Sequence, residues 1–169
     1  MLRRRFMHLL ASGILYAALS VNSRRGKAAN RYKFLHGVAS GDPLSDAVII
    51  WTRISGAQGE DVLVDWQVAS NAEMQTILRS GQAKTDAIRD YTVKIDVDDL
   101  PPGAKLYYRF IVDGLASRIG TTRTLPVGEP QSARFAVVSC SNYPTGYFHA
   151  YREIADRADL DAVIHLGEK

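Results

Sequence analysis

In the first two thirds of the chain, apolar and polar residues alternate in short runs that are separated by turn residues. Residues 46–54 (DAVIIWTRI) are rich in β-branched and aromatic side chains and lie between the turn sequences SGDP and SGAQG. A run of this kind predicts a buried strand. In residues 62–70, 91–97 and 106–113, apolar residues recur at every second position, which predicts strands with one buried face. Half-buried strands of this type pair antiparallel.

The alternation also predicts which side chains form the core. The expected inward-facing residues are Val62, Val64, Trp66, Val68, Tyr91, Val93, Ile95, Val97, Leu106, Tyr108, Phe110 and Val112. Residues 71–79 fit either a short helix or a bent strand, and the pattern does not decide between the two. Several strands at short spacing, without a long helix, predict a β-sandwich over roughly residues 32–126.

The pattern changes after residue 132. The segment 126–132 (PVGEPQS) contains two prolines and a glycine and is typical of a domain boundary. Residues 133–140 form a continuous apolar run, which predicts a strand buried on both faces. Residues 145–159 place apolar side chains at helical spacing, and 160–167 form a second apolar run. This order predicts a βαβ unit with parallel strands and a right-handed crossover.

The first 29 residues have the layout of an export signal. Three arginines, Arg3, Arg4 and Arg5, precede an apolar stretch from about residue 7 to residue 21. A membrane-spanning helix needs roughly 20 apolar residues, so this stretch favours a cleavable signal and no stable membrane span. The order of two arginines, any residue and the apolar pair Phe6–Met7 resembles a twin-arginine signal. The alternatives are a Sec signal or a membrane anchor with a basic flank. We therefore expect the twin-arginine translocase as a partner and a location in the periplasm, the cell wall or outside the cell.

Charge and cysteine content indicate which partners and which covalent links the chain can have. The chain has 21 Lys and Arg against 18 Asp and Glu, and residues 1–30 hold six of the cations and none of the acids. The remainder therefore carries 15 basic and 18 acidic side chains, a net charge of −3, which does not indicate a nucleic-acid partner. With 46% hydrophobic and 23% charged residues, the composition is that of a globular protein. Cys140 is the only cysteine, so the fold has no internal disulfide. We also expect a monomer.

Two chemically active side chains follow the two predicted parallel strands. Cys140 ends the run 133–140, and Glu168 follows the run 160–167 directly. The carboxyl ends of parallel strands meet at one edge of a sheet, where ligands bind. A thiolate and a carboxylate placed there form half of a metal site, so Cys140 and Glu168 are candidate metal ligands. The neighbours that could orient a ligand or a substrate oxygen are Ser139, Ser141 and Asn142.

Simpler roles for these residues stay open. A lone cysteine such as Cys140 is equally well a small buried hydrophobic residue. A thiol nucleophile is disfavoured, because cysteine phosphatases need an arginine six residues later and position 146 is glycine. His165 lies within an apolar run, so we expect a hydrogen-bonded core histidine. The residues expected at the surface or in turns are His36, Asp42, Asp46 and His149.

From about Phe34 onward, the chain resembles the opening of alkaline phosphatase D (PhoD-type) enzymes. The resemblance rests on the segments FLHGVASGDPLSDAVIIWTRI, LPPGAKLYYRF, RTLP and FAVVSCSNYPTGYFHAYREIADRADLDAVIHLGE, in this order. It implies a mainly β fold, with a fibronectin-III-like β-sandwich before an incomplete α/β start of a calcineurin-like metallophosphoesterase domain. The implied parts are a twin-arginine signal peptide at 1–29, the sandwich at 30–128 and the truncated second domain at 133–169.

The resemblance also implies a chemistry. Members of this family hydrolyse phosphomonoesters and phosphodiesters, including those of phospholipids and teichoic acids, with iron and calcium as cofactors. The cysteine that matches Cys140 binds iron, and an aspartate at the position of Glu168 bridges the metals. The implied reaction is hydrolysis of a phosphate ester by two-metal activation of water.

This sequence departs from the family pattern at its end. The family has HLGD where this chain has HLGE, and the extra methylene of Glu168 moves its oxygens by about a bond length, beyond the ~0.5 Å tolerance of such sites. The family's later ligands, including a tyrosine three positions on, fall beyond Lys169. We therefore expect an inactive N-terminal fragment of a secreted phosphoesterase. The alternative is an exported β-sandwich that binds a partner without catalysis.

Overall fold

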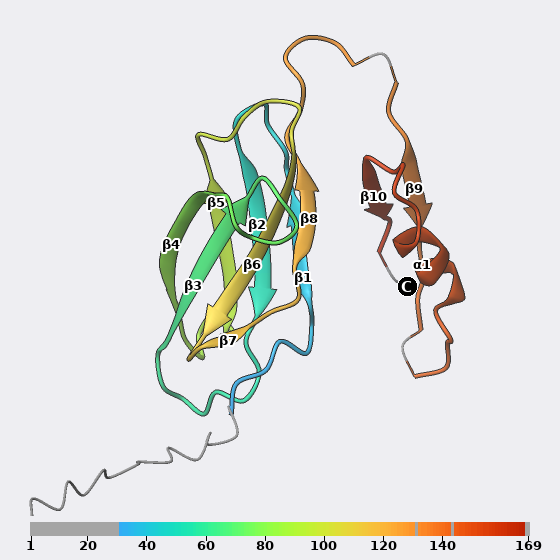
Figure 1. Cartoon of the computed structure of the whole chain (residues 1–169). Helices are drawn as coiled ribbons and strands as arrows, with labels where there is room; N and C mark the ends of the chain where they lie inside the picture. Colours follow the sequence, from blue (N-terminus) through green and yellow to red (C-terminus); the bar gives the residue numbers. More distant parts are fainter. Residues whose placement is uncertain (1–30, 131, 143, 168–169) are drawn as a thin grey trace, which may run out of the picture.

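The computed structural model describes residues 31–130, 132–142 and 144–167 (Figure 1). The predicted signal peptide and Glu168 lie outside these residues. The described chain consists of a β-sandwich followed by a small α/β unit, β9-α1-β10. In the described part of the chain, no helix is both long enough and apolar enough to cross a membrane.

The sandwich is built from two antiparallel sheets. The first has the order β1-β2-β5 and consists of β1 (Val38–Gly41), β2 (Val48–Arg53) and β5 (Thr92–Val97). The second has the order β4-β3-β6-β7, with β8 also paired to β6, and consists of β3 (Val62–Ala69), β4 (Ile77–Thr85), β6 (Lys105–Val112), β7 (Leu115–Ala116) and β8 (Gly120–Arg123). The predicted mainly β fold with an N-terminal sandwich is therefore confirmed, whereas its likeness to fibronectin type III stays a prediction.

The core lies between the two sheets and follows the predicted alternation. Along β6, Leu106, Tyr108, Phe110 and Val112 are all at most 2% exposed. The inward-facing valines of β3 and β5 are also buried, whereas Trp66 and Ile95 are only partly buried and pack against this core. A pleated strand points successive side chains to opposite faces, so the two-residue period alone places these residues.

Residues 71–79, for which the sequence allowed a helix or a bent strand, form a turn and then β4. The Met74 N–H donates to the Asn71 carbonyl (3.1 Å), and the Asn71 Oδ1 accepts the N–H groups of Gln75 (3.1 Å) and Thr76 (3.0 Å). A side chain that accepts backbone N–H groups two to five residues later favours a turn over a helix. The pairing of β3 with β4 shifts register between Val68 and Ala69, next to this turn.

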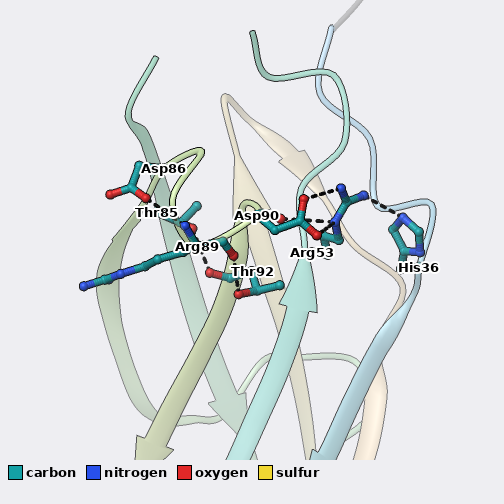
Figure 2. Close-up of polar contacts among 7 residues, drawn as sticks. All are labelled: His36, Arg53, Thr85, Asp86, Arg89, Asp90 and Thr92. Atoms are coloured by element: carbon teal, nitrogen blue, oxygen red, sulfur yellow. Dashed lines mark hydrogen bonds and ion pairs between the residues drawn. The ribbon is translucent and has the colours of Figure 1, made fainter. Parts of the chain in front are cut away.

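Local hydrogen bonds close the connection between β4 and β5 (Figure 2). The Thr85 hydroxyl donates to the Thr92 carbonyl (2.7 Å) where the two strands meet, and the Thr92 hydroxyl donates to the Arg89 carbonyl (2.7 Å). The Asp86 Oδ1 accepts the Arg89 N–H (3.0 Å). These contacts satisfy backbone groups in a tight loop and fix where β5 begins.

Arg53 of β2 holds the same loop from the other side (Figure 2). Its Nε and Nη2 donate to the two carboxylate oxygens of Asp90 (3.0 and 2.7 Å), and its Nη1 donates to the His36 Nε2 (2.8 Å). Asp90 and Tyr91 both have positive φ, 52° and 54°, which is unfavourable for residues with a Cβ. The bidentate Arg53 contact stabilises this strained pair of residues.

The second unit consists of β9 (Phe135–Val138), α1 (His149–Ala155) and β10 (Ala162–His165). β9 and β10 pair in parallel, from Phe135 opposite Ala162 to Val138 opposite His165, so the predicted strand–helix–strand order with parallel strands is confirmed. Each element is shorter than its apolar run in the sequence. The expected burial of β9 on both faces is wrong for the described residues, because Phe135 and Val137 are 55% and 59% exposed.

Candidate functional site

The candidate site lies where β9 and β10 end. The parallel pairing continues past both strands, since the Leu166 N–H donates to the Val138 carbonyl (2.8 Å) and the Cys140 N–H donates to the Gly167 carbonyl (3.0 Å). The backbone of Cys140 therefore lies beside the residue that precedes Glu168. The strand ends meet as the sequence predicted. A metal shared by Cys140 and Glu168 stays a prediction, because Glu168 lies outside the described residues.

Cys140 is an exposed free cysteine. The alternative that treats it as a small buried hydrophobic residue is therefore wrong for the described structure. Its φ of 51° is in the left-handed region, so the chain turns away from the sheet at this residue. An exposed thiol at the end of a parallel strand is accessible to a ligand at the sheet edge.

His165 is hydrogen-bonded, as expected, but it is not a core residue. Its side chain is exposed at the end of β10, because α1 packs beside it without enclosing it. Its Nδ1 accepts the Gly167 N–H (3.0 Å), and its Nε2 lies 3.1 Å from the Tyr151 hydroxyl. Since Nδ1 accepts, the neutral ring carries its proton on Nε2 and donates it to the Tyr151 oxygen.

Aromatic rings connect α1 to this strand end. The rings of Tyr151 and His165 are stacked at 6.4 Å between centroids and 13° between planes, and the Phe148 ring lies 5.7 Å from that of Tyr151. The sequence placed Phe148 and Tyr151 on one helical face but did not identify Tyr151 as a partner of His165. The sequence signal that could have indicated this contact is an aromatic helix face followed by a strand that ends in a histidine.

The opposite end of the unit is held by charged groups. The Arg134 N–H donates to the Asp161 carboxylate (2.8 Å), and the Asp161 N–H donates to the Arg134 carbonyl (2.9 Å). The Arg157 Nε and Nη2 donate to the two oxygens of Asp159 (2.9 and 2.7 Å), and Arg134 also contacts Asp159 (3.1 Å). The Arg157 guanidinium, helped by Arg134, lowers the pKa of Asp159 to about 2.

The other candidate residues have local structural roles. His36 and His149 are exposed, and Asp42 and Asp46 lie in the connection between β1 and β2, so the expected surface and turn positions are confirmed. Next to Cys140, the Asn142 carbonyl accepts the Thr145 N–H (3.2 Å) in a tight turn. Within residues 31–130, 132–142 and 144–167, no three His, Cys, Asp or Glu side chains lie close enough to hold a metal ion.

Two family models match the chain. The PhoD-like phosphatase N-terminal domain matches residues 19–126, and the PhoD-like phosphatase model matches residues 135–169. The first match ends at the proline where the sandwich gives way to the connecting segment. The second begins at the first residue of β9.

A curated relative and a solved structure agree with these matches. The chain is 39% identical over 147 residues to alkaline phosphatase D of Bacillus subtilis (strain 168), which covers 81% of this chain and 25% of the relative. A solved structure of PhoD superposes with a TM-score of 0.74 at 37% identity, which covers 82% of this chain and 28% of that one. The chain thus spans about a quarter of the length of the proteins it matches. It belongs to the PhoD-like phosphatase family.

Proposed function

We propose that this chain is the N-terminal part of an exported, metal-dependent enzyme that hydrolyses phosphate esters. The observation that carries the proposal is the end of the β9–β10 pair, where the exposed Cys140 lies beside Gly167 in a chain of the PhoD-like phosphatase family. A parallel sheet edge of this kind is where ligands bind in α/β domains. The sandwich has the role of a stable support for this edge.

In this proposal Cys140 is the thiolate ligand of iron, and Glu168 provides a carboxylate for iron and calcium. A thiolate at an open strand end suits iron, and a carboxylate suits both ions, so the donor types fit. When bound, the two ions would neutralise the charge of the phosphate and activate water. The contribution of the chain itself is to hold the Cys140 thiol at a fixed place on the sheet edge.

A chimera with the Bacillus relative tests this assignment. Residues 31–169 would replace the matching segment of alkaline phosphatase D, and hydrolysis of a chromogenic phosphodiester would be measured with iron and calcium. We expect the chimera to be active and Cys140→Ser to lower kcat by about 100-fold or more, as for loss of a ligand or its support. Cys140→Ser at unchanged activity would refute the proposed role of this thiol.

The same chimera tests Glu168. Because a glutamate reaches about one bond length further than the family's aspartate, we expect Glu168→Asp to raise the activity of the chimera. The chain of 169 residues alone is expected to show no turnover, because Cys140 and Glu168 supply two donors and a hard cation takes six or more. Turnover by the purified chain above a heat-treated control would contradict this expectation.

Export by the twin-arginine route is part of the proposal and rests on the arginine motif at residues 3–7. The chain would be fused to a reporter that is fluorescent only when it folds before export. Joint replacement of Arg3 and Arg4 by lysine should retain the reporter in the cytoplasm, whereas Arg5→Lys, at the variable position, should not. Export of the double variant as non-fluorescent reporter, detected by immunoblot of the exported fraction, would instead support a Sec signal.

A further inference from the structure

We propose that His165 is a positioning residue that clamps the strand ends at which Cys140 lies. The proposal rests on the proposed function, because it concerns the same sheet edge. No metal contact is assigned to His165. Its imidazole acts through the backbone of Gly167, which in turn binds the backbone of Cys140.

The contacts form a continuous chain from the helix to the cysteine. The His165 Nε2 lies 3.1 Å from the Tyr151 hydroxyl of α1, and the His165 Nδ1 accepts the Gly167 N–H at 3.0 Å. The Gly167 carbonyl then accepts the Cys140 N–H at 3.0 Å. Both polar groups of the Gly167 peptide backbone are therefore engaged, one by His165 and one by Cys140.

Such a clamp is needed because both strands leave the sheet at this point. Gly167 has a φ of 90° and Cys140 a φ of 51°, so both residues are in left-handed conformations beyond the last regular pair. Exposed backbone hydrogen bonds at the end of a ladder open easily. A side chain that fixes the Gly167 N–H holds this last pair closed.

The surroundings of His165 fix the imidazole in one orientation. The Gly167 N–H can only donate, so the neutral ring carries its proton on Nε2 and directs it at the Tyr151 oxygen, and the two ring planes lie 13° apart. Nδ1 is then left as the acceptor. A partner that orients a ligand through hydrogen bonds is typical of metal sites in proteins.

Two isosteric variants separate this role from general stability. In His165→Asn, the amide oxygen takes the place of Nδ1 and keeps the acceptor for Gly167. In His165→Gln, the amide reaches the place of Nε2 and loses that acceptor. In the purified full chain, we expect amide exchange of Gly167 and Cys140 to accelerate about tenfold in His165→Gln and to change little in His165→Asn.

A metal readout in the chimera with the Bacillus relative uses Co²⁺ as the probe and the cobalt–thiolate absorption as the signal. We expect the Kd for Co²⁺ to rise by about tenfold in His165→Gln and by much less in His165→Asn, with Cys140→Ser abolishing the band. Equal exchange rates of Gly167 in the two variants would overturn the clamp. A missing cobalt band in the unsubstituted chimera would instead count against the proposed metal role of Cys140, and the exchange rates would still decide the clamp.

Discussion

The sandwich and the β9-α1-β10 unit bury their apolar residues very differently. In the sandwich, Ile50, Val64 and Phe110 are completely buried between two sheets. In the second unit, Phe135 and Val137 of β9 remain more than half exposed. Strands in which apolar and polar residues alternate need one covering layer, which the opposite sheet provides. Parallel strands with apolar residues on both faces need two layers, and in the described chain all four residues of β10 are exposed.

The residues that stabilise the fold and the residues of the candidate site therefore lie in different units. The sandwich holds the large core, and its polar contacts, such as the Arg53–Asp90 pair, fasten loops. The candidate site lies on the unit with almost no core, where hydrogen bonds and ring stacking hold Cys140 and Gly167 together. We infer that the geometry of the site depends on these few polar and aromatic contacts.

The largest expected effect comes from removing a ring of the sandwich core. Phe110→Ala leaves a cavity at a residue that is 0% exposed, and we expect a loss of about 3–5 kcal/mol in the free energy of unfolding. Phe135→Ala removes the same ring from β9, where it is 55% exposed, and should cost less than about 1 kcal/mol. Urea unfolding followed by the fluorescence of Trp51 and Trp66 measures the loss in the sandwich, and amide hydrogen exchange of β9 measures the loss in the second unit.

That pair of variants is a direct test of the comparison between the two units. Equal losses would show that β9 is packed as tightly as β6 in solution. A covering layer absent from the described structure would then have to be present.

A smaller effect is expected from crowding the sandwich. A Cβ on Gly120 would clash with the ring of Tyr108, which is only 2% exposed. We expect Gly120→Ala to destabilise the protein by about 1–3 kcal/mol, as overpacking does. Gly41→Ala, where a Cβ meets nothing within 4 Å, is the matched control, and thermal unfolding compares the two. Similar melting temperatures would show that the Tyr108 ring shifts without cost.

The sequence predicted most of the sandwich because alternation is a local signal. The buried set of β6 follows directly from its two-residue period. The turn at Asn71 was undecided, because a helix and a bent strand share the same short apolar spacing and only the side-chain oxygen of Asn71 decides between them. Apolar composition overstated the burial of β9 and of His165, since it records what a strand prefers to contact and not which neighbours are present.

At the candidate site, the sequence predicted a place but not its contacts. That Cys140 meets the end of β10 followed from the parallel order of the strands. The hydrogen bonds of His165 to Gly167 and Tyr151 could not be predicted, because they depend on where α1 crosses the sheet. Register and helix placement arise from tertiary packing, which no local pattern contains.

Limited proteolysis should separate the two units without any substitution. Local opening governs cleavage, and residues 126–130 and the strands β9 and β10 have few buried contacts. We expect a protease of broad specificity to cut there first and to leave a core that ends near Pro126, as mass spectrometry would show. Equal resistance of residues 133–167 would count against a boundary in this segment.

The smallest effect concerns two arginine–carboxylate pairs, one in each unit. The Arg157 guanidinium holds the pKa of Asp159 at about 2, below the ordinary value of 3.8, and Arg53 lowers the pKa of Asp90. A lowered carboxyl pKa contributes stability that is present above the ordinary value and is lost as the pH falls from about 4 to about 2. Arg157→Gln should therefore return the Asp159 midpoint, followed by carbon-detected NMR, towards 3.8. Because Arg53 does not contact Asp159, Arg53→Gln should leave that midpoint unchanged, and a shift there would show that the two units are electrostatically coupled.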